Sequence, residues 1–147
     1  DTREVLLSAT FQVTAGDPLA LRSIARASLA FRKRTQPLDS HNAGCVFRNP
    51  EPDRDRLPPG IPWSAGALVD KAGLKGLAVG RAHVSPMHGN FIINEGGATA
   101  CDIRRLIGRC REEVREQFAV DLREEIVYLG DFDDHLNLDG AEAHAHR

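Results

Sequence analysis

One helical pattern in the C-terminal half of the chain constrains the fold more than any other feature. Apolar residues recur there at the spacing of a single helix face: Ile103, Leu106, Ile107, Cys110 and Val114. Thr99, followed three residues later by Asp102, resembles a capping box with Asp in place of Glu, so we expect the helix to begin directly after Thr99. A helix with one apolar face has to bury it against a second layer.

Short apolar segments supply that layer. They are residues 5–13, 45–47, 78–85, 91–94 and 124–129, each of which we expect to form a strand. Val5 to Val13 alternates in the manner of a half-buried strand, whereas residues 78–94 read as two strands around a turn at 86–89. Since this pair is hairpin-like and not a βαβ unit, the pattern predicts an α+β fold with a small, mostly antiparallel sheet and helices packed on one face.

Two further helices and a long loop separate these strands. Asp17 and Pro18 are typical of a helix start, and the helical spacing continues to about Lys33. Ser64 caps a short helix that runs to Ala72 and is ended by Gly73. Residues 50–63 hold five of the eight prolines and therefore form an exposed loop.

Length and composition indicate one ordinary globular domain. The chain has 147 residues, of which 41% are hydrophobic and 27% charged. A net charge of −2 does not indicate a nucleic-acid-binding surface. Three cysteines without paired spacing argue against a disulfide framework and a zinc site. The lack of a long apolar run and of a signal peptide favours the cytoplasm. The first residue is Asp1, so we expect a processed chain, a single domain or a fragment.

The sequence contains two clusters of charged residues whose function the pattern alone does not fix. The first is a group of basic residues on the helix after residue 18: Arg22, Arg26, Arg32, Lys33 and Arg34. It is either a solvated helix face or a contact for a phosphate-bearing ligand. The second lies in residues 131–147, which we expect to be a disordered acidic and His-rich tail. Its histidines and aspartates lack supporting partners for a metal, so no metal site is predicted.

A series of motifs resembles one enzyme family. The segment NAGCVFRNP at residues 42–50 is similar to a hallmark of the UDP-N-acetylenolpyruvoylglucosamine reductases, in which a Ser usually stands where Cys45 stands here. Further segments follow in the family's order: RKRTQP at 32–37, AGALVDKAGLKG at 65–76, HGNFIIN at 88–94, ATA at 98–100 and EIVYLG at 125–130. The resemblance covers roughly residues 4–130.

The resemblance implies a domain organisation and a reaction. Residues 1–15 are expected to be the last strand or a stub of a flavin-binding lobe, and residues 16–130 the C-terminal substrate-binding domain. The family reduces UDP-N-acetylglucosamine enolpyruvate to UDP-N-acetylmuramate with NADPH and FAD, in peptidoglycan precursor synthesis. We expect FAD to be bound mainly by an N-terminal lobe outside this chain, so the chain alone is expected to be inactive.

The family's site residues transfer onto matching positions. Cys45 is expected to donate a proton to the substrate, because a thiol is far more acidic than an aliphatic hydroxyl. Glu125 matches a carboxyl that stabilises or protonates the enolic intermediate, although on a strand either Glu124 or Glu125 can face a cleft. The expected substrate-binding residues are Arg32, Arg48, Asn49, Lys75, His88 and Asn90.

Each of these residues also has a purely structural interpretation. A free cysteine is more often a small buried hydrophobe than a proton donor. Arg48 alternatively positions its loop, Lys75 alternatively caps the preceding helix, and a His or Asn in a turn is usually structural. The competing function is a flavin-free module that binds a UDP-sugar or a protein partner. Such a module has no need for a proton donor at Cys45 together with a carboxyl at Glu125.

Overall fold

The computed structural model describes residues 5–130, and the chain divides into two units, residues 1–34 and 35–147, each considered by itself. The first unit contains most of α1 (Pro18–Thr35). This helix begins as predicted, because the carboxylate of Asp17 accepts hydrogen bonds from the amides of Leu19 (3.1 Å) and Ala20 (3.3 Å). None of the residues of α1 is buried.

The strand expected over residues 5–13 is absent. Residues 5–17 have no regular structure and are exposed. An alternating pattern states which face a strand would bury, but a strand also needs a neighbour for its backbone groups, and residues 5–13 pair with no other described residue. The assignment of residues 1–15 to the last strand or a stub of a flavin-binding lobe remains a prediction.

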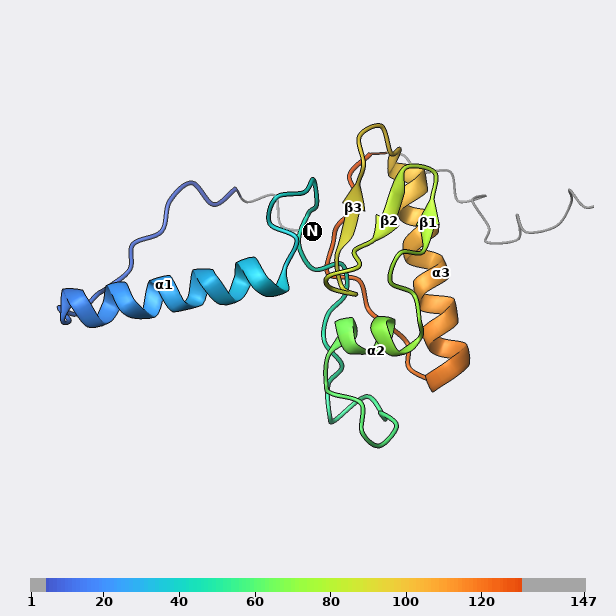
Figure 1. Ribbon diagram of the computed structural model, residues 1–147, viewed down its shortest axis with the longest axis horizontal. Helices are drawn as coiled ribbons and strands as arrows, with labels where there is room; N and C mark the ends of the chain where they lie inside the picture. Colours follow the sequence, from blue (N-terminus) through green and yellow to red (C-terminus); the bar gives the residue numbers. More distant parts are fainter. Residues whose placement is uncertain (1–4, 131–147) are drawn as a thin grey trace, which may run out of the picture. The chain divides into compact units, whose positions relative to one another are not determined.

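The second unit is built on a small antiparallel sheet (Figure 1). β1 (Ala78–Val79), β2 (Ala82–Val84) and β3 (Ile92–Asn94) lie side by side in that order. The helix α3 (Ala100–Phe118) packs against β1 and β2 and also touches α2 (Ala65–Lys71). This arrangement confirms the α+β class with a small antiparallel sheet.

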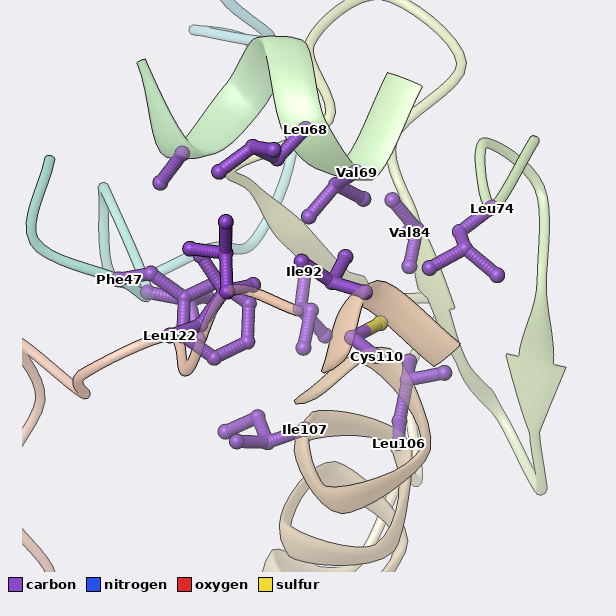
Figure 2. Packing of buried hydrophobic residues seen from close by; sticks show 14 of the residues in the cluster. Phe47, Leu68, Val69, Leu74, Val84, Ile92, Leu106, Ile107, Cys110 and Leu122 are labelled. Atoms are coloured by element: carbon purple, nitrogen blue, oxygen red, sulfur yellow. The ribbon is translucent and has the colours of Figure 1, made fainter. Parts of the chain in front are cut away.

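The core lies between α3, α2 and the sheet (Figure 2). The predicted stripe of α3 supplies four of its buried residues: Leu106, Ile107, Cys110 and Val114. Leu68 and Val69 of α2 meet them from one side, and Phe47 and Leu122 from another, all buried.

The helix caps follow the sequence closely. The hydroxyl of Thr99 accepts a hydrogen bond from the amide of Asp102, whose carboxylate accepts one from the amide of Thr99, which completes the capping box. Ser64 caps α2, and Gly73 after it adopts a φ of 75°. At that angle glycine carries no steric penalty, which is why the short helix ends there.

Two of the expected strands are shorter than their sequence patterns. The segment 78–85 breaks into β1 and β2 at a two-residue turn, in which Gly80 has a φ of 56°. The strand expected over 124–129 is reduced to an isolated bridge between Glu124 and Phe47. Next to this bridge the partner segment pairs with a different loop: the amide of Val46 donates to the carbonyl of Asn90 (3.0 Å), and Cys45 forms a bridge with Phe91.

Three further expectations concern membrane-spanning helices, the C-terminal tail and metal sites. Within residues 5–130, no helix is both long and apolar enough to cross a bilayer. The acidic and His-rich tail at residues 131–147, where no metal site is predicted, lies outside the described residues. Among the described residues, no group of three or more His, Cys, Asp or Glu side chains is placed to hold a metal ion.

Candidate functional site

Two neighbouring segments carry the expected proton donor and the expected carboxyl. The amide of Arg48 donates to the carbonyl of Arg123, and the amide of Glu125 donates to the carbonyl of Val46, both at 2.8 Å. These bonds flank the antiparallel bridge between Phe47 and Glu124. The pairing brings the NAGCVFRNP segment against the start of the EIVYLG segment, although they are far apart in sequence.

Cys45 is exposed and is therefore not a core residue. The buried thiol of the described chain is Cys110. Partial burial of its sulfur, followed by the negative charge of Glu125, raises the pKa of the Cys45 thiol above its ordinary value. A thiol in this setting stays protonated at neutral pH, which suits a proton donor better than a nucleophile.

The two consecutive glutamates take separate roles. Glu124 is half-buried and accepts from the Nη1 of Arg111 at 3.2 Å. Glu125 is exposed, and its Oε2 lies 3.0 Å from the Nε of Arg48. Because Glu125 acts on the Cys45 thiol through its charge, it is the glutamate placed to share a site with that thiol.

The side chain of Asn90 fixes the backbone of this site at Phe47. Its side-chain oxygen accepts from the amide of Phe47 and its side-chain nitrogen donates to the carbonyl of Phe47, both at 2.8 Å. Since Asn90 is only 3% exposed, both polar groups of the side chain are used inside the fold. The geometry supports the structural interpretation of Asn90, with an effect on the site through the backbone.

A second group of expected residues gathers at the start of α2. The Oδ1 of Asn49 accepts from the amide of Ala65 at 3.1 Å. A polar pocket of about 190 Å³ opens beside this helix and is lined by Ser64, Gly66, Ala67, Asp70, Lys75, Met87, His88 and Gly89. Lys75 lies across its wall, where its Nζ pairs with the carboxylate of Asp70 at 2.8 Å.

His88 faces the same pocket in its neutral form. Its Nδ1 accepts from the amide of Asn90 at 3.1 Å, which leaves the Nε2–H as the available donor. Burial, followed by the positive charge of Lys75, lowers the pKa of His88 below its usual value. The imidazole is therefore a neutral donor at physiological pH.

Glycines allow the loop of His88 to approach α2 closely. A Cβ at Gly89 would lie 2.6 Å from the carbonyl oxygen of Gly66, and a Cβ at Gly66 would lie 2.8 Å from the ring of His88. Both distances are shorter than a van der Waals contact, so side chains at either position would push the loop off the helix. The glycines thus set the depth of the pocket.

Sequence reasoning missed two residues that shape this region. The buried hydroxyl of Ser85 accepts from the amides of Met87 (3.1 Å) and His88 (3.3 Å), which fixes the turn. A Ser directly before a Pro is a recognised turn signal and could have indicated this role. Asp70, the partner of Lys75, carried no signal, because a partner in space is not visible from spacing alone. Arg32 belongs to the first unit, and its place relative to the other candidates stays a prediction.

Comparisons with known proteins agree with this architecture. Residues 36–129 match the family model described as the C-terminal domain of UDP-N-acetylenolpyruvoylglucosamine reductase. The chain is 43% identical over 128 residues to the UDP-N-acetylenolpyruvoylglucosamine reductase of Myxococcus xanthus, which covers 87% of this chain and 38% of that protein. The reductase of Bacillus velezensis is 44% identical over 126 residues, with 86% and 38% covered.

A solved structure shows the same likeness. The crystal structure of UDP-N-acetylenolpyruvylglucosamine reductase from Thermus caldophilus aligns with a TM-score of 0.50 and 43% identity, covering 71% of this chain and 33% of that one. The fold and the matched region first define a class: this is the C-terminal α+β domain of a reductase. The chain belongs to the UDP-N-acetylenolpyruvoylglucosamine reductase family. It spans 38% of the length of the curated relatives named above.

Proposed function

We propose that this chain is the substrate-binding domain of an NADPH- and FAD-dependent reductase that converts UDP-N-acetylglucosamine enolpyruvate to UDP-N-acetylmuramate. The observation that carries the proposal is the meeting of Cys45 and Glu125. An exposed thiol with a raised pKa and a carboxylate that acts on it by charge come from segments almost eighty residues apart in sequence. A domain that only binds has no use for this pair.

The reaction adds a hydride and a proton across the enolpyruvyl double bond. The flavin, when bound, supplies the hydride to the far carbon. The pair of electrons displaced from the double bond then lies on the carbon that bears the substrate carboxylate, and Cys45 delivers the proton to this second carbon. The thiolate left behind regains its proton from solvent or during the next cycle. Glu125 stabilises or protonates the enolic intermediate next to this thiol.

The described residues do not suit a flavin. Two pockets of the described residues measure about 240 and 190 Å³, below the usual range for cofactor sites. We therefore assign FAD to an N-terminal lobe outside this chain, and residues 1–15 to the stub of that lobe.

The polar pocket beside α2 is proposed to receive the diphosphate of the UDP moiety. Lys75 offers a cation for the diphosphate, and His88 offers the Nε2–H of a neutral imidazole. Asn49 lies at the same helix start and is proposed to meet the nucleotide sugar. Arg32 is proposed as a further cation for the substrate. The pathway is peptidoglycan precursor synthesis, located in the cytoplasm.

Two experiments test the proposal. In the first, this chain is titrated with UDP-N-acetylglucosamine enolpyruvate while backbone amide signals are followed by NMR. We expect shifts at Cys45, Asn49, Lys75 and Glu125. UDP-glucose serves as the control ligand, because it has the nucleotide but lacks the enolpyruvyl ether, and should shift Lys75 without shifting Cys45. A folded chain whose signals respond to neither ligand would contradict a preformed substrate site.

The second experiment uses the longer protein in which this domain is joined to its flavin-binding lobe. Cys45→Ser should retain substantial reductase activity, because a hydroxyl occupies this position in most of the family. Cys45→Ala should lose activity by about two to four orders of magnitude, the usual worth of general acid catalysis. Equal activity of the Ser and Ala variants would remove Cys45 from the mechanism.

A further inference from the structure

The only ion pair described for Glu125 is with Arg48. The Nε of Arg48 lies 3.0 Å from the Oε2 of Glu125. The neighbouring charges are engaged elsewhere: Glu124 with Arg111 at 3.2 Å, and Arg123 with Glu51 at 2.6 Å. Each charged residue of these two paired segments thus has its own partner, and the partner of Glu125 is Arg48.

The backbone dictates this match. With Phe47 opposite Glu124, Arg48 stands opposite Arg123 and Glu125 stands opposite Val46, two residues along from Arg123. Residues in this diagonal relation lie within reach of long side chains. The amides of both Arg48 and Glu125 are fixed by hydrogen bonds of 2.8 Å to the opposite segment. The bases of both side chains are therefore held rigidly.

Stability does not explain the pair. Both side chains are 55% exposed, and ion pairs this exposed contribute little to folding. Their geometry has a different consequence. A glutamate has three rotatable side-chain bonds, so an unpaired Glu125 on the surface would sample many positions relative to Cys45. An ion pair that holds one carboxylate oxygen 3.0 Å from the guanidinium reduces that freedom, because both side chains must keep one geometry.

We propose that Arg48 is a positioning residue, which fixes the carboxylate of Glu125 beside the thiol of Cys45 instead of binding the substrate directly. This inference rests on the proposed function, in which Glu125 acts on the enolic intermediate. The Arg48 cation also balances the Glu125 anion, so that the anionic substrate approaches a locally neutral pair. The raised pKa of the Cys45 thiol, caused in part by Glu125, is consistent with this arrangement.

The pair itself is tested on this chain by NMR, without any activity. We expect the chemical shift of the Arg48 Nε to move in Glu125→Gln, because the carboxylate 3.0 Å away loses its charge. The matched control is Glu124→Gln, which removes the adjacent carboxylate and should leave the Arg48 signal unchanged, since Glu124 pairs with Arg111. An Arg48 Nε signal at the chemical shift of a free guanidinium, unmoved by Glu125→Gln, would overturn the proposal.

The positioning role is tested on the longer protein with its flavin-binding lobe. Arg48→Gln should lower kcat by on the order of tenfold to a hundredfold with KM for the UDP-sugar nearly unchanged, because a misplaced catalytic group slows chemistry more than binding. Arg48→Lys should restore part of the rate, since it keeps the charge but loses the guanidinium. The double variant Arg48→Gln/Glu125→Gln should be no slower than Glu125→Gln, because Arg48 acts through Glu125.

The opposite results separate two failures. If Arg48→Gln raises KM at constant kcat, or if its effect adds fully to that of Glu125→Gln, Arg48 acts independently of Glu125 and the inference is wrong. If the parent protein shows no reductase activity on the enolpyruvyl ether, the proposed function fails. The NMR experiment then still decides whether Arg48 holds Glu125.

Discussion

At the scale of single residues, burial, followed by the charge of Glu125, raises the pKa of the Cys45 thiol above its ordinary value. Glu125→Gln removes that charge, so we expect the pKa of the Cys45 thiol to fall while staying above its ordinary value through burial. The measurement is the pH dependence of iodoacetamide alkylation of Cys45, followed by peptide mass analysis in a Cys101→Ser background. Glu124→Gln is the control and should leave the curve in place. An unmoved curve in Glu125→Gln would separate Glu125 from the thiol.

Cys110 gives a second residue-scale prediction, on stability. Burial raises the pKa of its thiol from 9.0 to about 12 in the folded state. The folded state therefore favours the protonated thiol. This contribution is complete below pH 9.0 and is lost as the pH rises towards 12. In this window the free energy of unfolding should fall by up to about 1.4 kcal/mol per pH unit more steeply than in Cys110→Ala. Urea unfolding from pH 8 upwards measures this, and parallel curves for the two proteins would contradict it.

Asn90 supplies a third prediction at this scale. Asn90→Ala leaves the buried amide and carbonyl of Phe47 without their partners. Each unsatisfied group costs about 1–3 kcal/mol, so we expect a loss of roughly 3 kcal/mol in the free energy of unfolding. The control is Asn94→Ala, whose side-chain oxygen accepts from Gly96 and Ala98 nearer the surface and whose loss should cost less. Equal losses in urea unfolding would argue against a special role for Asn90.

At the scale of elements, the capping box is the feature of α3 most open to a test. Thr99→Ala removes the acceptor for the amide of Asp102 and should lower the free energy of unfolding by about 1 kcal/mol. Thr99→Ser keeps the hydroxyl and should restore most of it. Thr10→Ala, in the exposed segment without regular structure, should change stability by less than about 0.5 kcal/mol. A cost at Thr10 equal to that at Thr99 would contradict the cap's importance.

The elements also show where the sequence is informative. The helices α1, α2 and α3 could be predicted because their starts and ends depend on residues close by, such as Asp17, Ser64 and Thr99. The strands were less predictable, because each needs a partner. Residues 5–13 alternate as well as any segment but pair with no other described residue.

In the candidate site, too, local features could be predicted from the sequence and contacts between distant segments could not. The chemical types at Cys45 and Glu125 could be chosen from the motifs, because each motif is local. The partners could not: that Asn90 binds Phe47 and that Arg48 pairs with Glu125 depends on the register of segments far apart in sequence. Spacing along the chain holds no information on that register until the fold is known.

At the scale of the whole molecule, the buried core lies in the second unit, whereas most of the exposed large apolar side chains lie in the first. All residues of the core cluster lie within the second unit, whereas the first unit exposes large apolar side chains: Val5, Leu6, Leu7, Phe11, Val13, Leu19, Leu21, Ile24, Leu29 and Phe31. Apolar surface of this extent on a free chain is a cause of self-association. The family match, at residues 36–129, coincides with the unit that holds the core.

Deleting residues 1–34 should therefore leave a folded domain. We expect its free energy of unfolding to stay within about 1 kcal/mol of that of the parent chain, because the deletion removes no residue of the buried core. We also expect less self-association in sedimentation velocity over a range of concentrations. A control variant with Leu6, Phe11 and Ile24 replaced by Ser should reduce self-association to a similar extent while keeping the chain length. If the shortened chain unfolds, the first unit contributes to the stability of the second, and the prediction that the second unit folds independently is wrong.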